Sequence, residues 1–191
     1  MNDIPEEKAR VPPDHPQAGS LAEADVQCVA LEDDGIIPNS RLPLLVYAGA
    51  IRFPGRDAAS TVESIFNVNQ WRAAWRYGVF SYHHYHSTAH ETLGVYRGTA
   101  TLQFGGDRGV TIEVHPGDVV VIPAGVAHKN LGSSTDFHVV GAYPIGRHCD
   151  MRHAEPDDRP EADENIAGVP LPDADPVYGP TGPLMRRWTP A

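Results

Sequence analysis

The most constraining feature of this sequence is the stretch GVFSYHHYHSTAHETLGVYRG, residues 78–98, in which histidines and a glutamate are closely spaced. His84 and His86 are two residues apart in a context typical of a β-strand, so both imidazoles should point to the same face. After a short turn through residues 87–89, Glu91 should lie on the returning strand of a hairpin, beside the two histidines. The spacing predicts that two imidazoles and one carboxylate meet at one point.

A second stretch, GDVVVIPAGVAHKN at residues 117–130, supplies a further histidine. It predicts a turn, a short buried strand and a second turn, after which His128 lies on a third strand. Three neutral imidazoles and a carboxylate suit a divalent transition metal such as Fe, Mn, Ni, Co, Cu or Zn, whereas Ca²⁺ prefers oxygen ligands alone. The sequence therefore predicts one such ion per chain, on His84, His86, Glu91 and His128.

Both stretches resemble the two sequence motifs of the cupin superfamily. The first fits G(x5)HxH(x4)E(x6)G at every fixed position: Gly78, His84, His86, Glu91 and Gly98. The second fits G(x5)PxG(x2)H(x3)N at Gly117, Pro123, Gly125 and His128, and departs at its last position, where Gly132 stands in place of Asn. The chain also looks like an uncharacterised group of bacterial single-domain cupins. The resemblance implies an all-β fold, a single double-stranded β-helix or jelly-roll barrel.

The rest of the chain divides into three parts. Residues 1–23 read as a flexible N-terminal tail, residues 24–153 as the cupin barrel, and residues 154–191 as a proline-rich, acidic C-terminal arm. Within the barrel, short strand-like segments separated by turn signals predict many strands and a single short helix, which begins near Asp57 or Ser60. In the arm, the density of proline argues against regular helix, so we expect an extended segment that lies on the barrel or on a neighbouring subunit.

Composition excludes several classes of function. The formal net charge of -10 argues against a general nucleic-acid binder and against electrostatic docking to an anionic membrane. No apolar run is long enough for a membrane span, and the polar N-terminus does not resemble a signal peptide. The two cysteines form neither a disulfide framework nor a zinc motif, so we expect a cytoplasmic protein. Because open cupin sheets leave edges to cover, we expect a homodimer.

Further residues in these segments are candidates for the lining of the site. Tyr82 shares the parity of His84 and should face the cup, where it could contact a substrate, and His138 is the one further candidate for acid–base chemistry. An alternative ligand set would use His86 and His90 in place of His84 and His86. It is disfavoured because His86 and His90 would not be two residues apart on one strand and so would not share a face in the way that His84 and His86 do. Trp75 and Tyr77 are expected to pack outside the cup. The cup should then be mostly apolar and suit a small, partly apolar substrate.

The metal and the apolar cup predict a metal-dependent enzyme. Because many enzymes of the resembled family use oxygen at such a site, an Fe(II) dioxygenase-like oxidoreductase is the leading hypothesis, with Fe(II) the favoured ion. A metal-dependent isomerase or lyase is the second hypothesis. A cupin that senses a ligand without catalysis is the third.

Overall fold

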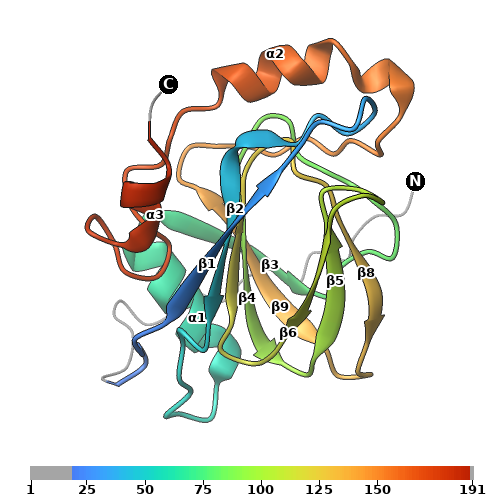
Figure 1. Ribbon diagram of the computed structural model, residues 1–191. Helices are drawn as coiled ribbons and strands as arrows, with labels where there is room; N and C mark the ends of the chain where they lie inside the picture. Colours follow the sequence, from blue (N-terminus) through green and yellow to red (C-terminus); the bar gives the residue numbers. More distant parts are fainter. Residues whose placement is uncertain (1–18, 190–191) are drawn as a thin grey trace.

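The computed structural model describes residues 19–189, which form two antiparallel sheets (Figure 1). The larger sheet has the strand order β1-β2-β7-β4-β9-β3, and the smaller has the order β6-β5-β8. The strands are β1 (Asp25–Leu31), β2 (Ser40–Ala48), β3 (Trp71–Tyr77), β4 (Glu91–Arg97), β5 (Ala100–Phe104), β6 (Val110–Val114), β7 (Val119–Ile122), β8 (His128–Ser133) and β9 (His138–Pro144). The predicted all-β, jelly-roll fold is confirmed.

Strand alternation divides the apolar side chains of the larger sheet between two cores. Leu93 and Val120 point inward and pack with Leu102 and Phe104 of the smaller sheet. Their neighbours in sequence, such as Val119 and Val121, point outward into a second core under a helix and the C-terminal arm. Because side chains alternate along a strand, one buried strand such as β7 contributes to both.

The predicted helix is α1 (Ala58–Val68), and it covers the outer face of the larger sheet. The side chain of Asp57 accepts a hydrogen bond from the backbone N–H of Ser60 at 3.0 Å, which caps the first turn. At its closest approach the helix passes over Gly94 of β4, where a Cβ atom would lie 2.5 Å from Cγ1 of Val62. A glycine in the middle of this strand is what allows the helix to pack so closely.

The prediction that the C-terminal arm has no regular helix is wrong. The arm contains a 3₁₀ turn, Pro156–Asp158, and two helices, α2 (Glu161–Gly168) and α3 (Pro183–Arg187). Two of its prolines lie at helix starts, where they do not interrupt a helix: Pro160 precedes α2, and Pro183 is the first residue of α3, where its missing N–H breaks no helical bond. Composition alone did not show this, because it counts prolines without locating them.

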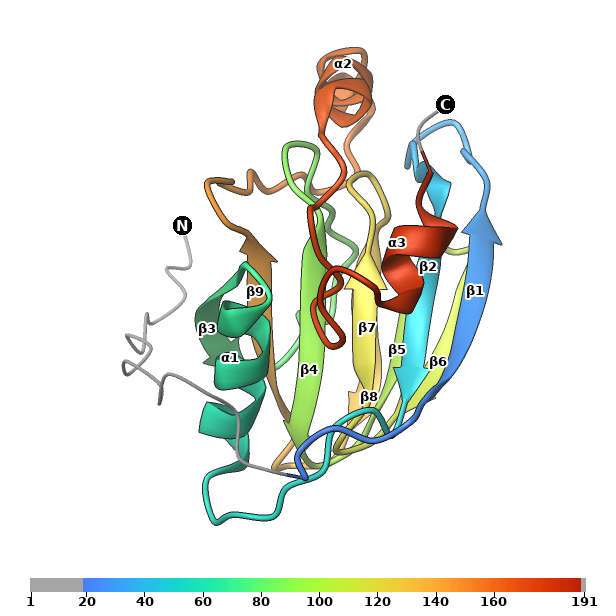
Figure 2. The same cartoon turned by 90° about the vertical axis from the view of Figure 1, so that its left-hand side faces the viewer.

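The arm lies on its own barrel, as one of the two predicted arrangements proposed. α3 packs against β2, and α2 lies beyond the end of the barrel at which β4 begins (Figure 2). Val177, Leu184 and Trp188 of the arm are buried in the outer core with α1. A buried carboxylate, Asp175, accepts hydrogen bonds from the Tyr47 hydroxyl of β2 at 2.7 Å and from the backbone N–H of Leu184 at 3.0 Å.

At the other end of the chain, most of the predicted N-terminal tail, residues 1–18, lies outside the described residues. The end of the predicted tail that the structure does describe, residues 19–23, contacts the barrel: the N–H of Ala22 donates to the carbonyl of Ala50 at 2.9 Å. No helix between residues 19 and 189 is long and apolar enough to cross a membrane.

Candidate metal centre

The four predicted ligands come from three segments at one end of the barrel. Glu91 is the first residue of β4 in the larger sheet, and His128 is the first residue of β8 in the smaller sheet. His84 and His86 lie in the segment between β3 and β4. The predicted hairpin between this segment and Glu91 is wrong: His84 pairs instead with His128, whose N–H donates to the carbonyl of His84 at 2.9 Å. The two sheets therefore each contribute ligands to one site.

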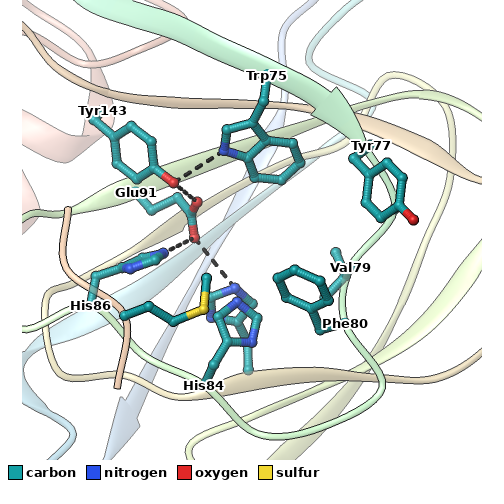
Figure 3. A pocket seen from close by; sticks show the side chains of 11 residues that line it. Trp75, Tyr77, Val79, Phe80, His84, His86, Glu91 and Tyr143 are labelled. Atoms are coloured by element: carbon teal, nitrogen blue, oxygen red, sulfur yellow. Dashed lines mark hydrogen bonds and ion pairs between the residues drawn. The ribbon is translucent and has the colours of Figure 1, made fainter. Parts of the chain in front are cut away.

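The structure brings all four side chains together (Figure 3). Oε2 of Glu91 lies 3.5 Å from Nε2 of His86 and 3.3 Å from Nε2 of His128. The ring of His84 completes the group, with its centroid 4.1 Å from that of His128 and 5.8 Å from that of His86. Each of the four residues is at most 6% exposed, so the group is almost fully removed from solvent.

Backbone carbonyls orient two of the imidazoles. Nδ1 of His86 donates a short hydrogen bond to the carbonyl oxygen of Asp150. Nδ1 of His84 lies 3.4 Å from the carbonyl oxygen of Tyr82. Because a carbonyl can only accept, each Nδ1 carries a hydrogen, and in the neutral ring Nε2 then has the lone pair with which it can ligate a metal.

The side chain of Asp150 in turn fixes the segment that carries His86. Its carboxylate accepts hydrogen bonds from the backbone N–H of Ser87 at 2.7 Å and from the hydroxyl of Thr88 at 3.2 Å. Although burial raises the pKa of Asp150, the hydrogen bonds from Ser87 and from Arg152 lower it to about 2. Asp150 therefore stays charged and holds the turn after His86 in place.

The charges within the group suit a cation. Burial lowers the pKa of His84 to about 4 and that of His128 well below its usual value. Burial raises the pKa of Glu91, but the neighbouring imidazoles, His86 first among them, outweigh burial and lower it to about 2. His86 differs: burial lowers its pKa, but the charge of Glu91 and the hydrogen bonds to Glu91 and to the Asp150 carbonyl together raise it above its usual value. A charged carboxylate thus lies in one group with two imidazoles, those of His84 and His128, that are neutral as metal ligation requires.

The positions of the donor atoms also fit a shared ion. Oε2 of Glu91 is buried and has no hydrogen-bond partner, although two Nε2 atoms lie close to it. Two donors on one ion are about 3.0–3.4 Å apart when bonds are about 2.1 Å and angles about 90–110°. Among residues 19–189, however, no three His, Cys, Asp or Glu side chains are already closed around one ion position. The donor set fits a divalent transition metal, and binding itself stays a prediction.

The four side chains form the floor of a cavity of about 30 Å³. Its other walls are aromatic or apolar, with two phenol hydroxyls and one indole N–H as their polar side-chain groups: Trp75, Tyr77, Gly78, Val79, Phe80, Tyr143 and Met151. The prediction that Trp75 and Tyr77 pack outside the cup is wrong. The pairing of β3 with β9 shifts by one residue between Ala73 and Trp75, so Trp71 faces the outer core while Trp75 turns inward. Strict alternation from Trp71 would have kept Trp75 outside.

The structure does not bring the two predicted catalytic residues into the cavity. Tyr82 is 44% exposed and stacks on Phe80 at 5.0 Å, because its segment is not a continuous strand and parity does not apply there. His138 pairs with Arg97, six residues along β4 from Glu91, which is about 20 Å at about 3.3 Å per residue. It lies toward the opposite end of the barrel. We correct both assignments accordingly.

The alternative ligand His90 is turned away from the site. Its Nδ1 accepts a hydrogen bond from the backbone N–H of Ala124 at 2.9 Å, and its ring packs on Trp188 of the arm at 4.7 Å. The geometry therefore favours His84 over His90 as the partner of His86.

Sequence reasoning missed Tyr143, which lies directly beside Glu91. Its hydroxyl donates to Oε1 of Glu91 at 2.8 Å and accepts from Nε1 of Trp75 at 3.1 Å. Alternation along β9 places Tyr143 on the same face as the inward-facing Val139. The alternation along this strand could be predicted from the sequence. The register of β9 with β4, which sets Tyr143 opposite Glu91, could not.

Comparison with known proteins decides the family. A family model described as "Cupin domain" matches residues 77–140. A curated relative, "Uncharacterized protein YjlB" from Bacillus subtilis (strain 168), is 44% identical over 167 residues, which is 87% of this chain and 98% of the relative. This chain belongs to the cupin family. The predicted resemblance is confirmed, and the relative supplies no reaction.

Solved structures resemble this cupin more distantly. An uncharacterised conserved protein with a double-stranded β-helix domain from Klebsiella pneumoniae is 16% identical, with 81% of this chain and 99% of that chain covered and a TM-score of 0.34. Procruciferin, an 11S globulin from Brassica napus, is 17% identical with a TM-score of 0.34; the match covers 71% of this chain and only 27% of procruciferin. Likenesses at this level carry no argument about what the cupin does.

Proposed function

We propose that this cupin is a metal-dependent oxidoreductase that reacts a small, partly apolar substrate with dioxygen at an iron(II) ion. The ion is held by His84, His86, Glu91 and His128. The observation that carries the proposal is the buried, charged Oε2 of Glu91, which has no hydrogen-bond partner and faces two imidazole Nε2 atoms at the floor of an aromatic cavity.

The residues of the cavity favour redox chemistry over proton transfer. Iron(II), when bound, would activate dioxygen, and the substrate that is oxidised would be the net electron donor. Among the cavity-lining residues of the described chain, Glu91 is the only carboxylate, and no lysine or arginine is present. Since Glu91 is assigned as a ligand, it is not available as a general base. The chain's own contribution is then to hold the ion, orient the substrate and exclude water.

The cavity walls define the substrate class. A volume of about 30 Å³ has room for one or two water molecules, so the part of the substrate that enters must be small. Tyr77 is 43% and Met151 is 38% exposed, so the cavity reaches the surface beside these two side chains. A substrate with a compact ligating group and an apolar remainder matches such a wall, whereas a phosphorylated or strongly anionic one has no cationic partner there.

The first experiment measures metal content. Protein purified without added metal should contain about one iron per chain, and replacing both His84 and His86 by alanine should abolish it. His138→Ala is the matched control, because it removes one imidazole from the same barrel but at the far end of β4. Full occupancy in the double variant, or equal loss in the control, would contradict the ligand assignment.

The second experiment tests oxygen access. Anaerobic protein loaded with iron(II) is exposed to nitric oxide, a surrogate for dioxygen, and its EPR spectrum is recorded. An open iron site should give a high-spin iron–nitrosyl signal, after which phenols, diketones and thiols are screened for oxygen uptake. Absence of the signal from iron-loaded protein would rule out oxygen chemistry. Zinc or nickel in the purified protein, together with turnover without oxygen, would support an isomerase or lyase instead.

A further inference from the structure

The carboxylate of Glu91 accepts a hydrogen bond from the phenol of Tyr143, and this phenol accepts one from the indole of Trp75. The Tyr143 hydroxyl donates to Oε1 of Glu91 at 2.8 Å, and the indole Nε1–H of Trp75 donates to the same hydroxyl at 3.1 Å (Figure 3). The indole has no acceptor atom, so it can only donate to the phenol. The phenol's single proton is thereby directed to Glu91. One carboxylate oxygen is occupied, while the other, Oε2, faces His86 and His128.

The backbone around this contact is shaped to admit the indole. Trp75 faces the cavity because of the one-residue shift in the pairing of β3 with β9. Its six-membered ring lies against Gly141, where a Cβ atom would be 2.1 Å from Cε2 of the indole. Gly141 and Tyr143 are two residues apart on β9, so they share a face of the strand. The glycine makes room for the indole, which in turn contacts the phenol.

We propose that Tyr143 is a positioning residue that restricts Glu91 to binding the metal through Oε2 alone. The inference rests on the proposed function and deepens it. A carboxylate can ligate through one or both oxygens, and a hydrogen bond to Oε1 disfavours the second. On a six-coordinate ion, three imidazoles and one carboxylate oxygen leave two positions free, whereas a two-oxygen carboxylate leaves one. Tyr143 thereby keeps a position open for substrate beside the one for dioxygen.

The experiment counts exchangeable positions without measuring activity. The full chain is loaded with Mn(II), and the water-proton relaxation rate gives the number of water molecules bound to the ion. Tyr143→Phe removes the hydroxyl and keeps the ring, so Oε1 of Glu91 is released to the metal. We expect the variant to bind about one fewer water molecule than the parent protein. An unchanged number in Tyr143→Phe would overturn the proposal.

Two variants serve as matched controls. Tyr47→Phe removes another buried hydroxyl that donates to a carboxylate, that of Asp175 at 2.7 Å, on the outer face of the sheet. Tyr178→Phe removes a second hydroxyl outside the cavity, which donates to the carbonyl oxygen of Ala22 at 2.7 Å beside the outer core. Both should keep the parent's number of bound waters. A drop in either control equal to that in Tyr143→Phe would overturn the assignment to Tyr143.

A measurement on the unaltered protein keeps the proposal testable if Tyr143→Phe fails to fold. The infrared difference spectrum between metal-loaded and metal-free protein reports the carboxylate stretches of Glu91. A wide separation of the two stretches indicates one-oxygen ligation and supports the proposal, and a narrow separation indicates two-oxygen ligation and refutes it. Protein that takes up no metal would refute the proposed function itself, whereas metal-loaded protein with the narrow separation refutes only the role of Tyr143.

Discussion

Replacing Asp175 by alanine should detach or strain the C-terminal arm and destabilise the whole domain. The Asp175 carboxylate is fully buried and accepts from four donors: the Tyr47 hydroxyl at 2.7 Å and the backbone N–H groups of Val177, Tyr178 and Leu184 at 2.8, 3.0 and 3.0 Å. Alanine offers none of them an acceptor. A buried donor without a partner costs about 1–3 kcal/mol.

The size of the effect can be bounded in two ways. If the arm stays docked, several donors lose their partner and the total is about 3–5 kcal/mol. If the arm leaves instead, the donors reach water, but the buried side chains of Val177, Leu184 and Trp188 become exposed at about 1.5–3 kcal/mol each. In both cases the free energy of unfolding falls by several kcal/mol. For a chain of this length, about 2–4 °C per kcal/mol gives a fall in melting temperature of about 6–20 °C.

Thermal unfolding followed by circular dichroism measures this fall, and tryptophan emission reports on the arm. Trp188 lies in the arm and the Trp71 indole donates to the carbonyl of Ala174 at 2.8 Å, so undocking should shift the emission to longer wavelength. Asp173→Ala is the matched control, because it removes an exposed carboxylate two residues away. If Asp175→Ala melts within about 1 °C of this control, the reasoning about the buried carboxylate is refuted.

Three further predictions follow from packing, charge and sheet edges. Gly94→Ala should destabilise by about 1–3 kcal/mol in urea unfolding, since the new Cβ would lie 2.5 Å from Val62 Cγ1; Gly132→Ala, with nothing within 4 Å, should be neutral. The Arg159 guanidinium lowers the pKa of Asp33, so their ion pair stabilises above pH of about 4 and is lost in more acidic solution. Asp33→Asn should therefore lower the melting temperature slightly at pH 7 and not at pH 3. A larger fall at pH 3 than at pH 7 would contradict the expected direction of this pH dependence. Sedimentation should give twice the chain mass of 20.7 kDa if the expected homodimer forms, and a monomer would contradict it.

Much of the fold and the ligand set could be predicted from local patterns. His84, His86, Glu91 and His128 were identified by spacing, and all four lie in one buried group. α1 was identified by its apolar period and its cap, and Asp57 does cap it. The pairing of His84 with His86 and the position of α1 depend on residues a few positions apart, where the periods of helix and strand decide which side chains share a face. Glu91 and His128 were added from the spacing of the two motifs, although the hairpin expected to bring Glu91 to the site is not the one that the structure forms.

The errors also have a common physical cause. Tyr82 was assigned by counting alternate residues and Trp75 by its place before the first metal strand, and neither guide holds where a segment is not a continuous strand or where pairing shifts by one residue. A one-residue shift moves a side chain to the opposite face of the sheet. The arm was misread because the density of proline was counted, whereas Pro160 and Pro183 lie at the starts of helices, where proline is tolerated.

The sequence by itself determined that the chain forms a β-barrel with a histidine- and glutamate-rich site, because local periodicity and motif spacing are properties of neighbouring residues. Only the tertiary structure decided what surrounds that site. The Tyr143–Glu91 and Trp75–Tyr143 hydrogen bonds join residues 52 and 68 positions apart, and the Tyr47–Asp175 bond joins residues 128 apart. Such contacts depend on strand register and on where the arm docks, which are set by the packing of the whole barrel and are not encoded in any short segment.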